Sequence, residues 1–376
     1  MTKGGLEDVV AANSAIADII GPQGKLTYRG IDIHDLARHS SFEETTYLLW
    51  FGSLPTREAL AEFSAELASH RALPPQVLTL MKDFPRNAAP MDALRTALSA
   101  LAFYDPQARD SSRDANVAKA MRVTAQTATI VGAYEQIRRG RQPIEPEEAG
   151  SHAESFLRML FGAEPDPLYA RAMDLALILH ADHELNASTF AARVTAATLA
   201  DMYSAVVSAI GALAGPLHGG ANEQVMKMLQ KIGEPARVEA YVTERLEAHQ
   251  KISGFGHRVY RTEDPRATHL REMSRQLGEH VGNLRWYEIS RKVEEVVMQQ
   301  KHLYANVDFY SASCYFTMGI PIDMFTPVFA VSRISGWTAH ILEQYADNRL
   351  IRPRAEYVGL KDVPYLPIDR RVRAAS

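Results

Sequence analysis

The sequence contains only one cysteine, Cys314, among its 376 residues. A single thiol cannot form a disulfide within the chain, so the sequence excludes a disulfide-stabilised secreted domain and indicates a reducing compartment. The neighbouring residues Ser313, Tyr315 and Phe316 favour a packed core position for this cysteine over a catalytic thiol.

The sequence also lacks an excess of charge and a long apolar run. Its 41 basic and 45 acidic residues give a formal net charge of −4, which argues against a nucleic-acid partner. Any anion site must therefore depend on local arginines. The longest stretch of low charge, residues 187–216, still contains Arg193 and Asp201, so we expect a buried alanine-rich helix pair and not a membrane span. Glu7 and Asp8 stand where a signal peptide would be apolar, and we expect a cytoplasmic protein.

No fixed internal period and no low-complexity linker is found along the sequence, which argues against a helical-repeat protein. Residues 25–30 predict a small β-hairpin, and apolar residues recur with a helical period from residue 33 onward. We therefore predict a mainly α fold with minor N-terminal β structure. Helices are predicted at residues 42–50 (capped by Ser40 or Ser41), 55–70, 91–104, 117–138, 151–160 and 168–179, with polar loops at 105–116, 139–150 and 162–167.

Residues 254–266 combine two glycines, a histidine and three arginines. Gly254 and Gly256 leave the backbone free to adopt positive φ and to approach a ligand closely, and His257 follows at once. An imidazole with several guanidinium groups suits a small molecule that carries phosphates or carboxylates. The plainer alternative is a glycine-containing turn that leads into a solvated basic helix. The arginines of this stretch are Arg258, Arg261 and Arg266.

Two histidines close the apolar helix predicted at residues 168–179. His180 and His183 are three residues apart, so they would share a face if the helix continued. A zinc site is one interpretation, although no HExxH pattern completes it. A structural pair of hydrogen-bonded histidines is another. The third is a polar binding site in which His183 faces a ligand while Asp182 and Glu184 hold the imidazoles in position.

Three further polar residues stand in unusual surroundings. His218 lies between Gly215-Pro216 and Gly219-Gly220, where one helix should stop and the next begin, so we expect it to face a ligand; a plain turn histidine is the alternative. Asp308 lies between two apolar residues, and burial should raise its pKa and make it a stronger base, unless it is a helix N-cap. Arg333 lies in an apolar helix and needs an anionic partner, from protein or ligand.

Taken together, these motifs resemble the citrate synthase family over essentially the whole chain. Several ordered motifs, each with its own chemistry, are far more specific than any one of them. The motifs that carry the resemblance are residues 26–32, 180–188, 215–222, 254–266, 306–311 and 352–354.

The resemblance implies a two-domain, mostly α-helical homodimer of the short, dimeric type. The large domain would comprise residues 1–218 plus 319–376, and the small domain, residues 219–318, would bind CoA and supply the catalytic aspartate. The cleft between them would close on the substrate.

The resemblance also implies an activity, the condensation of acetyl-CoA with oxaloacetate and water to citrate and CoA. Asp308 would be the base, His218 would donate to the thioester oxygen, and His257 would polarise the ketone of oxaloacetate. The carboxylates of oxaloacetate would be held by His183, Arg266, Arg333 and Arg352, the last from the partner subunit. CoA would contact Lys251, Ile252, Gly254, Phe255, Gly256, Arg261 and Asn306, with no metal and no tightly bound cofactor.

Two alternatives remain open from the sequence. A 2-methylcitrate synthase would use propionyl-CoA with nearly the same motifs, and one methylene in an apolar pocket changes selectivity by only about 1–3 kcal/mol. A non-catalytic binding or scaffold protein on the same fold would be expected to lose Asp308, His218 or His257. All three are present.

Overall fold

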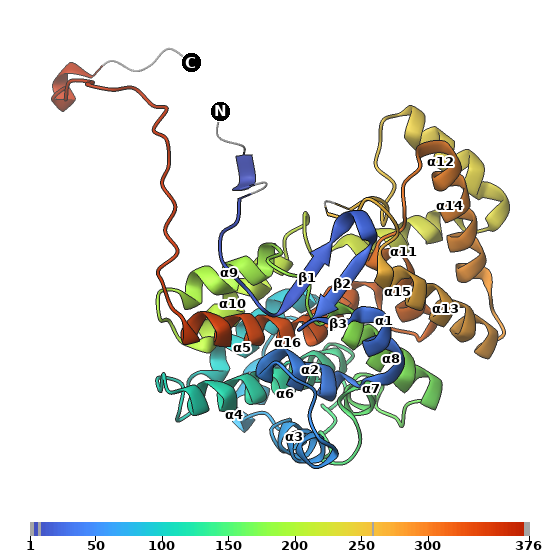
Figure 1. The fold of residues 1–376 in the computed structure, drawn as a ribbon, viewed down its shortest axis with the longest axis horizontal. Coiled ribbons are helices and arrows are strands. Elements are labelled where there is room, and N and C mark those ends of the chain that lie inside the picture. Colours follow the sequence, from blue (N-terminus) through green and yellow to red (C-terminus); the bar gives the residue numbers. More distant parts are fainter. Residues whose placement is uncertain (1–3, 7–8, 258, 372–376) are drawn as a thin grey trace.

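The computed structural model describes residues 4–6, 9–257 and 259–371 of the chain. Within these residues it contains sixteen α-helices and one small antiparallel sheet (Figure 1), so the predicted mainly α fold with minor N-terminal β structure is confirmed. The expectations attached to Glu7, Asp8 and Arg258 fall outside the described residues.

The N-terminal sheet is a hairpin followed by a short third strand. β1 (Ala17–Ile20) pairs with β2 (Lys25–Tyr28), and β2 pairs with β3 (Ile31–Asp32), both antiparallel. The β1–β2 connection ends at Gly24, whose φ of 60° lies in the left-handed region that favours glycine. The strand structure predicted near residues 25–30 is therefore confirmed, and it buries Tyr28 completely.

The first half of the chain is otherwise helical. Ser41 caps α2 by accepting a hydrogen bond from the backbone N–H of Glu44 (3.2 Å), as predicted. α6 begins at Arg113, inside the stretch predicted to be a loop, because Ser112 caps it through the N–H of Ala115. The helices are α1 (Ile33–His39), α2 (Phe42–Phe51), α3 (Arg57–Ser69), α4 (Pro75–Lys82), α5 (Pro90–Leu101), α6 (Arg113–Arg138), α7 (His152–Phe161) and α8 (Pro167–His180).

The core is built around one long helix, α16 (Phe325–Ala346), which crosses the middle of the molecule (Figure 1). It packs against α2, α6, α8, α9 and α10, and its residues 325–341 are all buried. Such an all-round burial is typical of a central core helix. α9 (Ala187–Ala196) and α10 (Met202–Leu213) pack on each other and on α16, which confirms the predicted alanine-rich helix pair.

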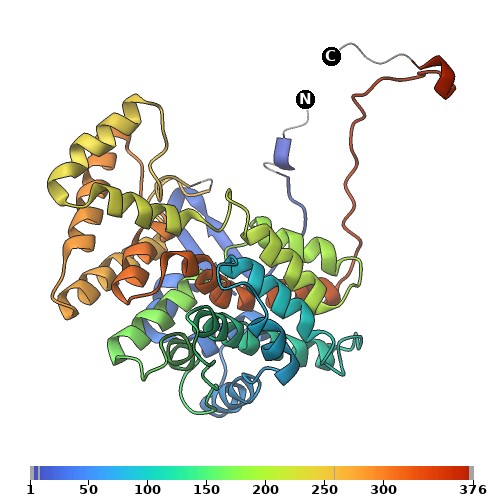
Figure 2. The same ribbon diagram turned by 180° about the vertical axis from the view of Figure 1, so that it is seen from behind.

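Residues 221–317 supply a separate group of helices that lies to one side of the molecule, coloured yellow to orange in Figures 1 and 2. α15 packs against α11, α13 and α14, and α12 packs against α14. Cys314, on α15, is buried, as predicted. No helix in the described part of the chain combines the length and apolarity needed to cross a bilayer. The helices of this group are α11 (Ala221–Ile232), α12 (Val238–Glu247), α13 (Pro265–His280), α14 (Arg285–Lys301) and α15 (Val307–Thr317).

Beyond α16, residues 349–371 run away from the helical body as a largely extended segment (Figures 1 and 2). It exposes large apolar side chains, with Val358 91%, Tyr365 83% and Leu360 82% accessible to solvent. Such a series of exposed large apolar residues is unusual on the surface of a protein.

Gly336 on α16 gives a test of the packing between α16 and the loop after α8. A Cβ at this position would lie 2.3 Å from the carbonyl oxygen of Ala181 and 2.5 Å from Oδ1 of Asp182. We expect Gly336→Ala to lower the free energy of unfolding by about 1–3 kcal/mol, the usual cost of overpacking, as measured by urea titration.

The matched control for this substitution is Gly211→Ala on α10, where an added Cβ meets nothing within 4 Å. Alanine is the better helix former, so this variant should be as stable as the parent or more stable. Equal destabilisation of both variants would contradict a specific clash at Gly336.

Candidate active site

α8 ends at His180, so His180 and His183 do not share a helix face. His180 is fully buried, and its Nδ1 lies 2.8 Å from the carbonyl oxygen of Ala176, a structural contact within its own helix. His183 lies in the following loop, with its Nε2 3.3 Å from the hydroxyl of Tyr260 and its ring centroid 5.2 Å from that of His257. His180 therefore makes a structural contact within α8, whereas His183 contacts Tyr260 and His257. Among the described residues, no group of three or more His, Cys, Asp or Glu could hold a metal ion.

The loop that carries His257 has the backbone predicted for it. Gly254 and Gly256 have φ values of 82° and 80°, and the loop is fastened to the segment before α15. The N–H of Gly256 donates to the carbonyl of Tyr304 (3.0 Å), and the side-chain amide of Asn306 donates to the carbonyl of Gly256 (3.1 Å). Asn306 therefore acts here as a support for the loop.

Two backbone groups decide which nitrogen of His257 carries the proton. The N–H groups of Val259 and Tyr260 point at its Nδ1 at 3.0 and 3.2 Å. A backbone N–H can only donate, so Nδ1 is the acceptor and Nε2 carries the proton. Burial, reinforced by Arg266, lowers the pKa of His257 to about 4, so the ring is neutral near pH 7.

His218 lies in the connection between α10 and α11, as predicted, and it contacts α9. Its Nε2 is 2.8 Å from Oγ of Ser188 and 3.3 Å from the backbone N–H of Ser188. The backbone donor makes Nε2 the acceptor and leaves the proton on Nδ1. The indole N–H of Trp337 on α16 donates to the same Ser188 hydroxyl (3.1 Å) and so fixes it in place. Burial first, and then Arg333, lower the pKa of His218 to about 4.

Asp308 is the second residue of α15 and is not its N-cap. The cap is Asn306, whose side-chain oxygen accepts a hydrogen bond from the N–H of Asp308 (3.1 Å). The N-cap interpretation of Asp308 was wrong, because the cap lies two residues earlier. Burial raises the pKa of Asp308 from 3.8 to about 6, although Arg266 and Arg333 pull the pKa down. The predicted rise in pKa is confirmed.

Two buried arginines reach the same region, each with a different partner. Arg266 forms a two-point ion pair with Asp264 (2.9 and 2.8 Å), whose carboxylate also accepts from the N–H of Val307 (3.1 Å). Arg333 donates from Nε to the carbonyl of His180 (2.6 Å), and no acid among the described residues forms a salt bridge with it. Burial outweighs the attraction of Asp182 and lowers the pKa of Arg333 to about 10. A buried arginine without a paired carboxylate is prepared for an anionic ligand.

The charges of Arg266 and Arg333 shift the pKa values of several predicted site residues, which shows that these residues lie near the two arginines. Arg266 and Arg333 both act on His183 and on Asp308, while Arg333 also acts on His218 and Arg266 on His257. Residues from α13, α15, α16 and three loops thus lie within electrostatic range of these two positive charges. The residues brought together are His183, His218, His257, Arg266, Arg333 and Asp308.

The remaining predicted residues lie in two other places. The loop segment that leads to His257 contains Lys251, Ile252 and residues 254–256. In this segment Lys251 is exposed and Ile252 is buried. Arg261 lines a cavity of about 180 Å³ together with His257 of the cluster, Gly256 and residues 302–305. Arg352, in contrast, lies in the extended C-terminal segment, beside a hollow lined by residues from both ends of the chain, and does not join the cluster within one chain.

Three residues that support the cluster were not predicted from the sequence. Ser188 and Trp337 hold His218, and Asp264 pairs with Arg266. Ser188 lies within one of the quoted motifs, but nothing local shows that it meets a histidine thirty residues further along the chain.

Comparison with known proteins identifies the family. A sequence profile described as "Citrate synthase, C-terminal domain" matches residues 5–354 of this chain. The chain belongs to the citrate synthase family. "Citrate synthase 2" from Bacillus subtilis (strain 168) is 52% identical over 98% of each chain, and a citrate synthase from Haloferax volcanii is 51% identical over 98% of this chain and 99% of its own. The crystal structure of the citrate synthase from Pyrobaculum aerophilum superposes with a TM-score of 0.93 at 41% identity, covering 98% and 95%.

Two further comparisons bear on ligands. 2-Methylcitrate synthases from Shewanella oneidensis and Mycobacterium tuberculosis are 40% and 43% identical, over 99% and 95% of this chain. The citrate synthase from Thermoplasma acidophilum, solved as a ternary complex with carboxymethyl coenzyme A and oxaloacetate, superposes with a TM-score of 0.92 at 34% identity over 98% of both chains. The relatives named citrate synthase described above, at 52% and 51% identity, are more similar to this chain than these two 2-methylcitrate synthases are.

The raised pKa of Asp308 predicts how stability depends on pH. Because the pKa rises from 3.8 to about 6 on folding, the folded protein binds this proton more tightly than the unfolded chain. Asp308 therefore costs stability increasingly between about pH 4 and pH 6, and the full cost persists at higher pH. We expect Asp308→Asn to raise the free energy of unfolding by about 1–3 kcal/mol at about pH 8, and to change it little at about pH 4.

The control for this pH dependence is Asp347→Asn, at an exposed position just beyond α16. Denaturant titrations of both variants and the parent at the two pH values measure the difference. A gain in stability from Asp308→Asn that is the same at both pH values would contradict the ionisation of the partly buried Asp308 carboxylate as its cause.

Proposed function

We propose that this protein is a cytoplasmic homodimer that condenses acetyl-CoA with oxaloacetate and water to give citrate and CoA. The proposal is supported by one carboxylate and two neutral imidazoles that lie within electrostatic range of two buried arginines, in a chain of the citrate synthase family. Identities of 52% and 51% to proteins named citrate synthase, over nearly the whole length, support acetyl-CoA as the acyl donor.

Asp308 is the proposed base that removes a proton from the acetyl methyl group. Its pKa of about 6 makes it a stronger base than a solvated carboxylate, yet it is still ionised near neutral pH. The proton moves to the Asp308 carboxylate while the electron pair of the C–H bond enters the enolate of the thioester.

His218 is the proposed donor to the thioester oxygen, on which the enolate charge develops. The Ser188 contacts leave the proton on Nδ1, and the low pKa keeps the ring neutral, so it donates without first being charged. A single oriented donor to such an oxyanion is typically worth about 3–4 kcal/mol of transition-state stabilisation.

His257 is the proposed donor to the ketone oxygen of oxaloacetate. Its protonated Nε2 can polarise the carbonyl and then transfer its proton to the alkoxide that forms when the enolate carbon attacks. The ring then takes a proton back from water, which restores the neutral imidazole. Water then cleaves the thioester of citryl-CoA, which releases citrate and the free thiol of CoA. Proton removal and condensation are assigned to side chains of this protein, and CoA acts as a co-substrate.

The carboxylates of oxaloacetate are assigned to His183, Arg266, Arg333 and the partner subunit's Arg352. Guanidinium–carboxylate pairs fix orientation as well as charge, and orientation is where a two-substrate reaction gains most. Arg333 has free capacity for such a pair, whereas two nitrogens of Arg266 are already bound to Asp264. CoA is assigned to residues 251–256, with Arg261 near its phosphates and Asn306 behind the loop.

The same proposal divides the chain into a large domain, residues 1–218 plus 319–376, and a small domain, residues 219–318. The lateral position of α11 to α15 supports this division (Figure 1). The extended C-terminal segment with its exposed apolar residues supports a dimer in which this segment reaches the other subunit. Arg352 lies at the beginning of that segment.

A direct comparison of acyl donors tests the proposed substrate. We expect kcat/KM for acetyl-CoA to exceed that for propionyl-CoA, with oxaloacetate saturating and CoA release followed by a thiol reagent. A higher kcat/KM for propionyl-CoA would identify a 2-methylcitrate synthase instead. No turnover with either donor would favour a binding protein built on this fold.

Asp308→Asn tests the base. The amide cannot accept the methyl proton, so turnover should fall by at least a thousandfold, while the Kd of oxaloacetate measured by calorimetry should change less than threefold. If binding of oxaloacetate and turnover disappeared together in a folded variant, the assignment of Asp308 as base would fail.

Subunit mixing tests the sharing of Arg352. His218→Ala and Arg352→Ala homodimers should both be nearly inactive. After equal amounts exchange subunits at random, half of the dimers are mixed, and one of the two sites in each mixed dimer is intact. About a quarter of the parental activity should therefore return. No recovery, with exchange verified by mass spectrometry, would place Arg352 in the site of its own chain or outside any site.

A further inference from the structure

A buried chain of polar side chains leads from the loop that carries His183 towards the surface. It begins at Asp182, continues through His340 on α16 and Arg193 on α9, and ends at Glu343 on α16. Asp182 and His340 are completely buried and Arg193 is nearly so, while Glu343 is half-buried. None of these residues belongs to the proposed set that contacts substrate.

The direction of each hydrogen bond in this chain follows from the arginine. Nη1 of Arg193 lies 3.2 Å from Nδ1 of His340, and a guanidinium can only donate. Nδ1 of His340 is therefore the acceptor, and its Nε2 carries the proton. That Nε2 lies 3.3 and 3.4 Å from the two carboxylate oxygens of Asp182, so the imidazole N–H is directed at the carboxylate.

Arg193 is itself held by two acceptors on α16. Its Nε donates to the side-chain oxygen of Gln344 (3.0 Å), and its Nη1 donates to Glu343 (2.6 Å). The other oxygen of Glu343 accepts from the backbone N–H of Ala15, just before β1 (2.8 Å). Because the guanidinium is fixed on one side by Glu343 and Gln344, it has one orientation towards His340.

The Asp182 carboxylate in turn shapes the loop on both sides of His183. It accepts a hydrogen bond from the N–H of Glu184 (3.1 Å), a residue with a φ of 53°. A non-glycine residue in this left-handed region needs support from its surroundings. The Tyr28 hydroxyl donates to the carbonyl of Asp182 (2.9 Å) and accepts from its N–H (3.2 Å), so the main chain before His183 is clamped as well.

We propose that His340 and Arg193 are positioning residues for oxaloacetate binding, which hold the Asp182 carboxylate and, through the turn at Glu184, the imidazole of His183. The proposal rests on the proposed function, in which His183 contacts a carboxylate of the keto-acid substrate. If this hydrogen-bonded series of side chains served only stability, breaking it would weaken binding of both substrates to the same extent, in proportion to the fraction of protein that unfolds. As a positioning device it affects oxaloacetate specifically.

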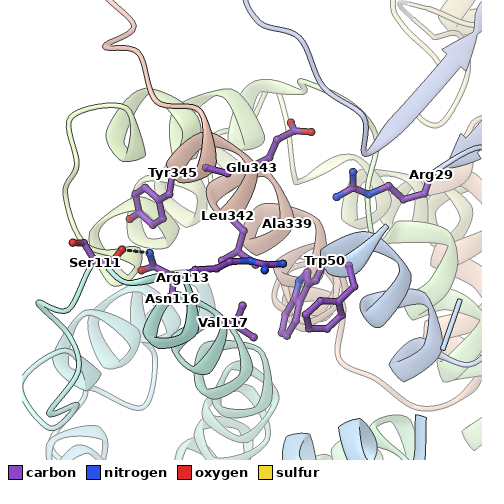
Figure 3. A pocket seen from close by; sticks show the side chains of 12 residues that line it. Arg29, Trp50, Ser111, Arg113, Asn116, Val117, Ala339, Leu342, Glu343 and Tyr345 are labelled. Atoms are coloured by element: carbon purple, nitrogen blue, oxygen red, sulfur yellow. Dashed lines mark hydrogen bonds between the residues drawn. The ribbon is translucent and has the colours of Figure 1, made fainter. Parts of the chain in front are cut away.

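Glu343, the outer member of this hydrogen-bonded series, lines a cavity of about 470 Å³. Another residue of this cavity provides a control variant for the test below. Figure 3 shows Glu343 on the cavity wall, with Arg29 on one side and Arg113 on another. Arg113, at the beginning of α6, lines this cavity but has no hydrogen bond to any member of the chain among the described contacts. Arg113→Ala therefore changes the same surface without touching the positioning residues.

The test compares two substitutions of His340. Glutamine retains an N–H donor that can reach the Asp182 carboxylate, whereas leucine has a similar size and no donor. We expect His340→Leu to raise KM and Kd for oxaloacetate at least tenfold while KM for acetyl-CoA changes less than twofold. His340→Gln should recover most of the loss, and Arg113→Ala should leave both KM values unchanged.

A double substitution isolates the contact between Asp182 and His340. If the two residues act through the same hydrogen bond, Asp182→Asn combined with His340→Leu should raise KM for oxaloacetate no further than the more severe single change. Thermal melting of each variant shows whether it is folded at the assay temperature. If His340→Leu does not fold, His340→Gln and Asp182→Asn still give the comparison of KM for the two substrates.

Two results would overturn the positioning role. One is an unchanged KM for oxaloacetate in a folded His340→Leu variant. The other is an equal rise in KM for both substrates, without rescue by glutamine. If the unsubstituted protein forms citrate, either result rejects the positioning role alone. If the unsubstituted protein forms no citrate from acetyl-CoA and oxaloacetate, the proposed function itself is rejected.

Discussion

The region in which the candidate catalytic residues meet depends on two buried positive charges, the guanidinium groups of Arg266 and Arg333. Both are almost completely enclosed, and the desolvation of a charge in such a place is costly unless a partner is present. Arg266 has that partner in Asp264, but Arg333 is left with a backbone carbonyl and the ring of Phe329, 4.5 Å away. The imbalance creates a local positive potential in a protein whose formal net charge is negative.

This potential has opposite effects on the two kinds of titratable group around it. It adds to burial in lowering the pKa values of the histidines, so His183, His218 and His257 remain neutral near pH 7. For Asp308 it opposes burial, and the carboxyl therefore has a pKa of about 6 and not a higher one. Neutral imidazoles that donate, beside a carboxylate that is ionised but weakly solvated, are what proton abstraction next to a carbonyl requires.

Orientation in this region comes from the backbone and from residues behind the site. The N–H groups that follow His257 and the N–H of Ser188 select the tautomers of His257 and His218. The Asn306 side chain caps α15 and also supports the glycine-containing loop. A proton on the wrong nitrogen would turn a donor into an acceptor, so these contacts matter as much as the identity of the residues they orient.

Much of the site could be predicted from the sequence, because some signals are local. Gly254 and Gly256 predicted a loop with positive φ, which the structure has, and an aspartate between apolar residues predicted a raised pKa for Asp308. Helix periods and caps gave the helical architecture for the same reason, since they depend on neighbours within a few residues. The beginning of α6 was missed because its cap, Ser112, lies in a polar stretch that resembles a loop.

The sequence by itself determined the fold class, the family and the residue types that carry the chemistry, since each depends on local patterns or on ordered motifs. Only the tertiary structure decided that His180 is structural while His183 contacts His257, that Ser188 orients His218, and that His340 connects Asp182 to Arg193. The physical reason is that hydrogen bonds are effective over about 3 Å. Whether residues 30 to 158 positions apart approach that closely depends on how the helices pack around α16, and no local pattern records it.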